Sequence, residues 1–255
     1  MFVDSSYMPE YTFPAMATSG LETIISLAGF RVTNTLIATL LVDTFIIVLI
    51  VSLKKRISLV PGKFQGVVET VIDYLYETTE QVAGARADLL FPWVAIFFIY
   101  IAISNLMGLL PGFGTIGFFR SDGFVPLLRA STSDLNVTLA LAVVSVFATH
   151  ILAIRTTGLG SYLKRFFALN PLLLFVGLME IVQEVTKLLS FSFRLYGNIS
   201  AGESVLGTMA SISAFILPIP FLGLEILVAV IQALIFSLLT LAFMSIMTET
   251  HTKSH

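Results

Sequence analysis

An arginine, Arg194, lies within one of the most apolar stretches of this chain, residues 188–203. Its guanidinium cannot be neutralised by losing a proton, and a fixed charge in hydrocarbon costs about 3 kcal/mol on insertion scales. Charged residues in such stretches are functional as a rule and mark paths for ions or substrates. Arg194 is therefore the first candidate functional residue, and a purely structural cation is the alternative.

Other ionisable residues share the stretch with Arg194. At 100° per residue, positions seven apart drift only slowly around a helix, so Glu180, Lys187 and Arg194 form one polar stripe. Glu184 and Asn198 fall close to the same stripe. Glu184 and Lys187, three residues apart, either carry function or only neutralise each other. Glu180 is either functional or interfacial.

Two further acids lie off this stripe. Glu203 is nine residues beyond Arg194 and on the opposite side of the helix, so it need not be the salt-bridge partner of Arg194. The next apolar stretch carries Glu225 and, seven residues later, Gln232, which are the candidate neighbours of Glu203. Each glutamate is either functional or a protonated, hydrogen-bonded structural acid. The small residues around them allow another helix to approach closely: Ser190, Ser192, Gly197, Ser200, Ala201, Gly202, Ser204 and Gly207.

The composition places these residues in a membrane. Of the 255 residues, 56% are hydrophobic and only 12% charged, more apolar surface than a soluble protein of this size can bury. The absence of cysteine excludes a disulfide framework and a thiolate site, and His150, His251 and His255 form no ligand cluster, so we expect neither a metal nor a cofactor. The net charge of −2 excludes a basic footprint for nucleic acid.

Five apolar stretches are long enough to cross a bilayer as helices, which takes about 20 residues. They cover 34–53, 91–112, 135–154, 171–216 and 221–247, with Pro92 expected in a first helical turn and Pro218 and Pro220 expected to form a turn. Residues 65–83 alternate apolar and acidic positions at helical spacing, which predicts an amphipathic helix on the membrane surface, with packing as its more natural role. The predicted fold class is all-α and polytopic.

The fourth stretch is too long for a vertical crossing. About 40 helical residues span roughly 60 Å, about twice the thickness of the hydrocarbon core. Because both ends are still apolar, we expect this helix and the next to form a long, strongly tilted hairpin. The chain then divides into an outer segment 1–33, helices one to three within 34–155, and the tilted hairpin 171–248, all in a single integral-membrane domain, 1–255.

Basic residues orient the chain in the membrane. The loops 54–90 and 155–170 and the C-terminal tail hold nine of the fourteen Lys and Arg, whereas the opposite side holds Arg31, Arg120 and Arg129. The positive-inside rule therefore predicts an outer N-terminus and a cytoplasmic C-terminus. Because no Lys or Arg precedes Arg31, the start lacks the features of a signal or transit peptide and is expected to stay on the protein.

Several polar residues elsewhere in the spans either line a water path or serve the structure. Asp43 lies in the middle of the first span, and Asn105, Asp134, Asn136 and Thr138 lie near the outer side. For Asp134 a helix-capping role is favoured. His150 is expected to be a packed polar residue rather than a ligand.

The stretch 187–203 resembles subunit a of the F-type rotary ATP synthases. The resemblance rests on Lys187 to Ser190, on Arg194-Leu-Tyr-Gly-Asn-Ile-Ser-Ala-Gly-Glu203, and on Ile231-Gln-Ala-Leu-Ile-Phe236 in the last span. Asn105-Leu-Met-Gly-Leu-Leu-Pro111 and Asp134-Leu-Asn-Val-Thr138 are further landmarks, so that it covers about 33–245. The chain departs from the pattern at Gly108, where some members carry an acid, and at Glu225, where some carry histidine.

The resemblance implies a stator that carries protons to and from a rotating ring of c subunits through two offset half-channels. Glu203, Glu225, Asn198 and Gln232 would form the outer half-channel. Glu180, and more weakly Glu184, would form the inner one. Arg194 would separate the two and hold each passing ring carboxylate ionised. Further implied partners are subunit b of the peripheral stalk, the remaining subunits of the complex and membrane lipid.

The resemblance implies no catalysis of ATP synthesis by this chain itself, which carries no phosphate-binding Gly-x-x-x-x-Gly-Lys-[Ser/Thr] loop. A secondary transporter and a structural scaffold are the rival functions, but no internal repeat supports the former, and ordered charges disfavour the latter. Proton against sodium specificity and the size of the ring stay open. A prokaryotic plasma membrane is the expected location, with a thylakoid or mitochondrial inner membrane as the alternative.

Overall fold

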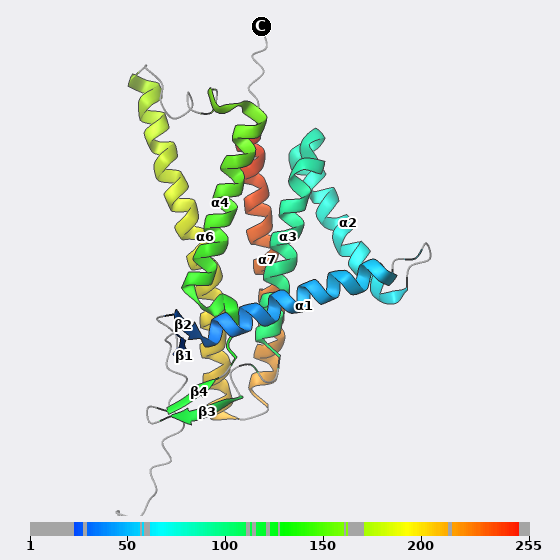
Figure 1. The fold of residues 1–255 in the computed structure, drawn as a ribbon, viewed down its shortest axis with the longest axis vertical. Coiled ribbons are helices and arrows are strands. Elements are labelled where there is room, and N and C mark those ends of the chain that lie inside the picture. The colour runs from blue at the N-terminus through cyan, green and yellow to red at the C-terminus, as the bar shows by residue number, and fades with distance from the viewer. Residues whose placement is uncertain are drawn as a thin grey trace, which may run out of the picture.

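The computed structural model describes residues 23–27, 30–56, 58, 62–110, 113, 116–120, 123–126, 128–160, 162, 171–213 and 216–249. Six long helices dominate this part of the chain (Figure 1): α1 Asn34–Arg56, α2 Lys63–Ala83, α3 Ala87–Gly108, α4 Leu135–Thr157, α6 Pro171–Ile212 and α7 Pro218–Thr248. The predicted all-α, polytopic class is confirmed. The expected surface helix corresponds to α2, and the expected long fourth helix has 42 residues.

Four helices run side by side and build the core. In Figure 1, α3, α4, α6 and α7 run along the long axis, with α6 descending and α7 returning. The main core cluster draws on α3, α4, α6 and α7, with Phe97, Phe191, Leu195, Ala233 and Phe236 among its members. Because Phe191, Leu195 and Ile199 recur every four residues, α6 buries one continuous stripe. The hairpin of α6 and α7 is thereby fixed in register against α3 and α4.

Helix α1 crosses the other helices instead of joining them (Figure 1). Its buried residues, Asn34, Thr35, Ala38 and Val42, all lie near its start. Beyond them it is apolar and exposed, as expected for a surface that meets lipid or another membrane protein. Because α1 crosses the bundle, the two cannot both lie along the membrane normal, which fits the expected tilt of the long hairpin.

Four segments of the described chain are long and apolar enough to cross a membrane: Asn34–Lys55, Lys63–Gly108, Leu135–Thr157 and Pro218–Thr248. Helix α6 is not among them, since its charged and small polar residues dilute its apolar content. The chain is a multi-pass membrane protein.

Two expectations about proline were wrong. Pro92 lies inside α3, which begins at Ala87, because the short 3-10 helix η2 (Gly84–Arg86) leads directly from α2 into α3. Pro218 and Pro220 lie in the first turn of α7. Their missing N–H groups cost nothing there, because the first N–H groups of a helix have no intrahelical acceptor.

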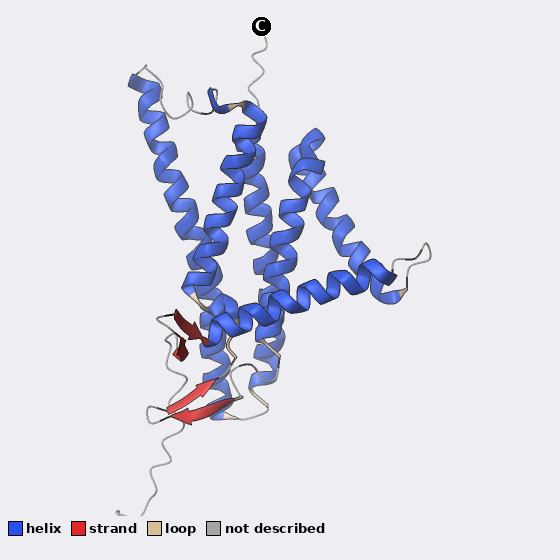
Figure 2. Ribbon diagram, in the orientation of Figure 1, coloured by secondary structure: helices blue, strands red, loops and turns tan. Residues whose placement is uncertain are grey.

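Short connecting elements gather at one end of the bundle. Figure 2 shows two hairpins there, β1 (Thr23–Leu27) with β2 (Phe30–Thr33) and β3 (Gly117–Arg120) with β4 (Gly123–Pro126). The 3-10 helix η3 (Ser131–Ser133) is buried at this end and packs against α1, α3, α4 and α6. None of these three elements was expected from the sequence. They shape the end of the bundle at which α6 finishes and α7 begins.

Candidate functional site

Arg194 lies near the middle of α6, on a face that this chain leaves open. The neighbouring Leu195 is buried in the α6 stripe, and one residue turns a helix by 100°, so Arg194 comes to the exposed side. Several of the exposed residues around it along α6 are small, namely Ser190, Gly197, Ala201, Ser204 and Thr208. Leu189 and Phe193 are also exposed there.

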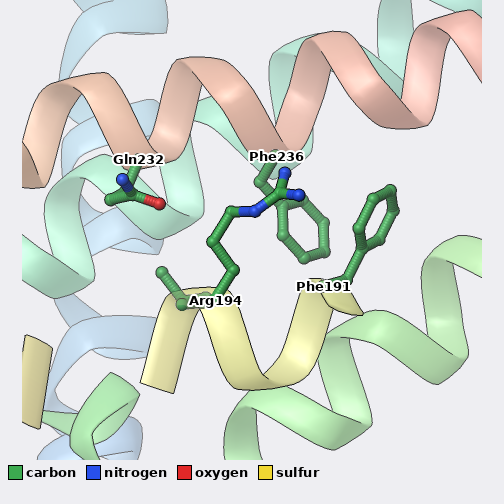
Figure 3. Close-up of a pocket in the computed structure, with 5 residues that line it drawn as sticks. Phe191, Arg194, Gln232 and Phe236 are labelled. Atoms are coloured by element: carbon green, nitrogen blue, oxygen red, sulfur yellow. The ribbon is translucent and has the colours of Figure 1, made fainter. Parts of the chain in front are cut away.

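The side chain of Arg194 extends toward α7 and borders a small pocket (Figure 3). The pocket is lined by Phe191, Arg194 and Leu195 of α6 and by Gln232 and Phe236 of α7. Arg194 Nη2 donates a hydrogen bond of 3.4 Å to Ser190 Oγ. No carboxylate in the described part of the chain forms an ion pair with Arg194. The guanidinium is thus held beside two aromatic rings with its charge available to another molecule.

Gln232 and Asn198 are separated from the two outer acids. Gln232 lines the pocket of Arg194 and lies two helical turns along α7 from Glu225. Asn198 is exposed on α6, one turn beyond Arg194. The structure therefore brings Gln232 to the level of Arg194, whereas the sequence indicated it as a neighbour of Glu203.

Glu203 forms an ion pair with Arg129. Nε and Nη2 of Arg129 donate to the same oxygen, Oε2 of Glu203, over 3.2 and 3.1 Å. The side chains are 17% and 29% exposed for Arg129 and Glu203, so the pair is largely shielded from solvent. The sequence correctly excluded Arg194 as the partner of Glu203 but did not indicate Arg129.

The carboxyl group of Glu225 packs against the backbone of α6 at Gly202. A Cβ atom on Gly202 would overlap the carboxyl group, so the glycine provides the space that this group occupies. Glu225 is 8% exposed. Because Gly202 precedes Glu203, the two acids come together at one end of the hairpin, as the sequence predicted.

A hydroxyl group on the same helix lacks a partner. Among the described residues, Ser200 Oγ is the buried side-chain atom without a hydrogen bond to the protein. Buried hydroxyl groups are nearly always satisfied, often by water. Ser200 lies between Arg194 and Glu203 in the sequence, on the stretch of α6 that joins their levels.

Glu184 is engaged on two sides. Its Oε1 accepts a hydrogen bond of 2.6 Å from Lys187 Nζ, and its Oε2 lies 3.5 Å from His150 Nε2 on α4. His150 Nδ1 is hydrogen-bonded to the Tyr162 hydroxyl at 2.8 Å. Lys187 Nζ also lies 4.3 Å from the centroid of the Phe243 ring. The ion pair of Glu184 and Lys187, left open by the sequence, is thus formed.

Glu180 lies one turn before Glu184 on α6 and is half-buried. It lies toward the start of α6, far along the helix from Glu203. The three acids of α6 therefore follow the expected order, with Arg194 between Glu184 and Glu203.

Asp134 caps helix α4, as the sequence favoured. Its Oδ1 accepts from the backbone N–H of Asn136 at 2.8 Å, and its Oδ2 accepts from the Thr35 hydroxyl of α1 at 2.9 Å. The cap therefore also ties α1 to α4. Asn105 accepts from Thr132 at 2.7 Å and donates to the carbonyl of Ala229 at 3.3 Å, which joins α3, η3 and α7. These two side chains serve the structure.

Gly108 allows the segment before η3 to approach α3 closely. A Cβ atom on Gly108 would lie 2.5 Å from the Cβ of Ala130. An acidic side chain at this position would not fit without displacing Ala130. Arg129, which precedes Ala130, instead directs its charge to Glu203.

Known proteins of one family are similar to this chain along most of its length. The family model described as ATP synthase A chain matches residues 32–245. ATP synthase subunit a 2 of Pelobacter propionicus is 32% identical over 214 residues, which are 82% of this chain and 86% of that protein. ATP synthase subunit a of Legionella pneumophila is 30% identical over 221 residues, 86% of this chain and 88% of that protein. ATP synthase subunit a of Desulfotalea psychrophila is 34% identical over 193 residues, 74% and 73% respectively.

Proposed function

This chain belongs to the ATP synthase A chain family, the proton-translocating membrane subunits of the F1Fo ATP synthase, and on that premise we propose that Arg194 separates two offset half-channels. One half-channel opens to each side of the membrane. Each delivers protons to, or accepts them from, carboxylates on a rotating ring of c subunits. The flow of protons thereby turns the ring and drives ATP synthesis elsewhere in the complex.

One observation carries this proposal: the permanent charge of Arg194 stands on an exposed face without an acid of the described chain as its partner. An unpaired charge within a membrane is expensive. A carboxylate on another subunit would relieve that cost, and the small residues on the same face let its helix approach closely. The ring carboxylate would be held ionised while it faces Arg194, and neutral and protonated while it faces lipid.

We assign Glu203 and Glu225 to the outer half-channel, with Asn198 and Gln232 between them and Arg194. The proximity of the two acids at the end of the hairpin supports this assignment. The unsatisfied hydroxyl group of Ser200 supports a hydrated path along this part of α6. Asn198 and Gln232, near the level of Arg194, would pass the proton to the ring.

We assign Glu180 to the inner half-channel and give Glu184 a weaker claim. Glu184 already has Lys187 and His150 as partners, and an acid that is hydrogen-bonded to a lysine is less free to exchange a proton. The excess of Lys and Arg near this end of the bundle supports a cytoplasmic location for it, with the N-terminus outside. The c-ring would then lie along the hairpin of α6 and α7, and subunit b and lipid would cover other apolar surfaces.

Replacement of Arg194 by alanine tests the proposal. The complete complex, purified and reconstituted in lipid vesicles, is expected to assemble with the Arg194→Ala subunit and to make no ATP when a proton gradient is imposed. Arg155→Ala, at the exposed end of α4, is the control and is expected to keep the wild-type rate. A wild-type rate of synthesis by Arg194→Ala would exclude this mechanism.

A further inference from the structure

Arg129 is the one charged side chain outside the helices that reaches the acids of the α6 and α7 hairpin within the described part of the chain. It lies in the segment 128–130, which leads into η3. Both of its bonds end on a single oxygen of Glu203. The side chain of Ser133 and the backbone of Ala130, in the same segment, also act on the carboxyl group of Glu203.

The segment that carries Arg129 is held firmly. Ala130 is 4% exposed and packs against Gly108 of α3. The next residues are hydrogen-bonded to α3 as well, Ser131 to Ser104 and Thr132 to Asn105. Since the backbone next to Arg129 is fixed to α3, holding the guanidinium against Glu203 costs side-chain conformational entropy but little backbone entropy. The contact with Glu203 is thus built into the fold.

The net charge of Arg129, Glu203 and Glu225 together depends on how many protons the two acids hold. Arg129 acts on Glu203 from the segment before η3, and the charge of Glu203 acts in turn on Glu225 of α7. One guanidinium and two carboxyl groups are neutral together when they hold one proton. Without Arg129, the two carboxyl groups are neutral only with two protons. Because a low-dielectric site favours the neutral state, Arg129 decides how many protons the two acids hold.

We propose that Arg129 is a positioning residue of the outer acid pair. It holds the carboxylate of Glu203 at the connection of α3 and α4, and it sets the pair of Glu203 and Glu225 to exchange one proton. This inference rests on the proposed role of the two glutamates in the outer half-channel. It adds a third group, from a loop, to a site otherwise made of two helices.

The charge balance predicts that a second substitution at Glu203 compensates in part for the loss of Arg129. Arg129→Gln leaves two acids that hold two protons, and Glu203→Gln leaves an arginine beside one acid, which is neutral without any proton. The double variant, Arg129→Gln with Glu203→Gln, leaves Glu225 alone and restores a site that is neutral with one proton. We therefore expect it to work faster than Arg129→Gln. Arg129→Lys keeps the charge and is expected to keep most of the activity.

The test compares these four variants in the complete reconstituted complex. The rate of ATP synthesis under an imposed proton gradient is measured per assembled complex, with assembly followed on native gels. We expect about a tenfold loss for Arg129→Gln and for Glu203→Gln, which is less than the roughly 10²–10⁴-fold contributed by a group that transfers a proton directly, because Glu225 is kept in both variants. Arg155→Gln, at the other end of α4, controls for loss of any exposed arginine.

Three results would overturn the inference: a wild-type rate for Arg129→Gln, an equal loss for Arg129→Lys, or a double variant slower than Arg129→Gln. Because a purely structural role predicts that a second lesion adds to the first, recovery in the double variant separates the two explanations. Arg194→Ala, measured in the same vesicles, distinguishes a failure of the proposed function from a failure of the proposed role of Arg129. If it is active, the proposed function falls. If it is inactive and the double variant is slower, only the role of Arg129 falls.

Discussion

The carboxyl group of Glu225 on α7 rests against the bare backbone of Gly202 on α6, in space that a methyl group would fill. Glycine is required here by a side chain of another helix and not by its own backbone, since the residue lies within regular α-helix. The contact fixes the height at which the two acids of the outer end meet. A substitution at Gly202 is therefore expected to move the carboxyl group of Glu225 without changing any charge.

The first prediction follows from this contact. Gly202→Ala is expected to displace the carboxyl group of Glu225 and to slow ATP synthesis in reconstituted vesicles on the order of 10-fold. Gly66→Ala is the control, because a Cβ atom at Gly66 meets nothing within 4 Å. It lies on α2, away from the hairpin, and is expected to keep the wild-type rate. Equal rates for both variants would mean that the position of Glu225 does not matter.

A second prediction concerns the close approach of Gly108 and Ala130. The Cβ atom of Gly108→Ala would lie 2.5 Å from that of Ala130, and overpacking of this kind costs about 1–3 kcal/mol. The variant is expected to lower the unfolding temperature of the detergent-solubilised complex. Adding Ala130→Gly removes the Cβ contact and is expected to recover part of the loss. A double variant less stable than Gly108→Ala would contradict this account.

A third prediction compares three acids. Glu203→Gln and Glu225→Gln are expected to slow proton delivery from the outer side far more than Asp43→Asn. Asp43 lies on α1, which leaves the bundle after its first turns. The measurement is the rate of ATP synthesis at a fixed gradient, with equal amounts of assembled complex. Small and equal effects of all three substitutions would show that the outer half-channel runs elsewhere.

Local patterns in the sequence were sufficient to predict the helices and the order of the acids. Asp134 before an apolar run predicted a cap because capping depends on residues two or three apart. The length of α6 and the order of Glu180, Arg194 and Glu203 follow from helical periodicity. Pro218 and Pro220 were misplaced because the first turn of a helix tolerates proline and can be mistaken for the turn before it. Pro92 was misplaced because η2 leads directly into α3, so that the helix begins before the proline.

The partner of Glu203 could not be predicted in the same way. Arg129 is 74 residues away in a segment without periodicity, and its reach depends on how η3 packs against α3. The contact of Gly202 and Glu225 could not be predicted either, because it depends on the register of two helices.

The last prediction separates Glu180 from Glu184. Glu184 links α6 to α4 through His150 and holds Lys187, and its side chain is only 13% exposed. Glu184→Gln weakens the hydrogen bond from Lys187, and a hydrogen bond between charged groups is worth about 1.5–3 kcal/mol. We therefore expect it to lower the unfolding temperature of the complex. Glu180→Gln is expected to slow proton release through the proposed inner half-channel, measured as the rate of synthesis under a fixed gradient. The reverse result, a stable but slow Glu184→Gln and a fully active Glu180→Gln, would transfer the inner half-channel to Glu184.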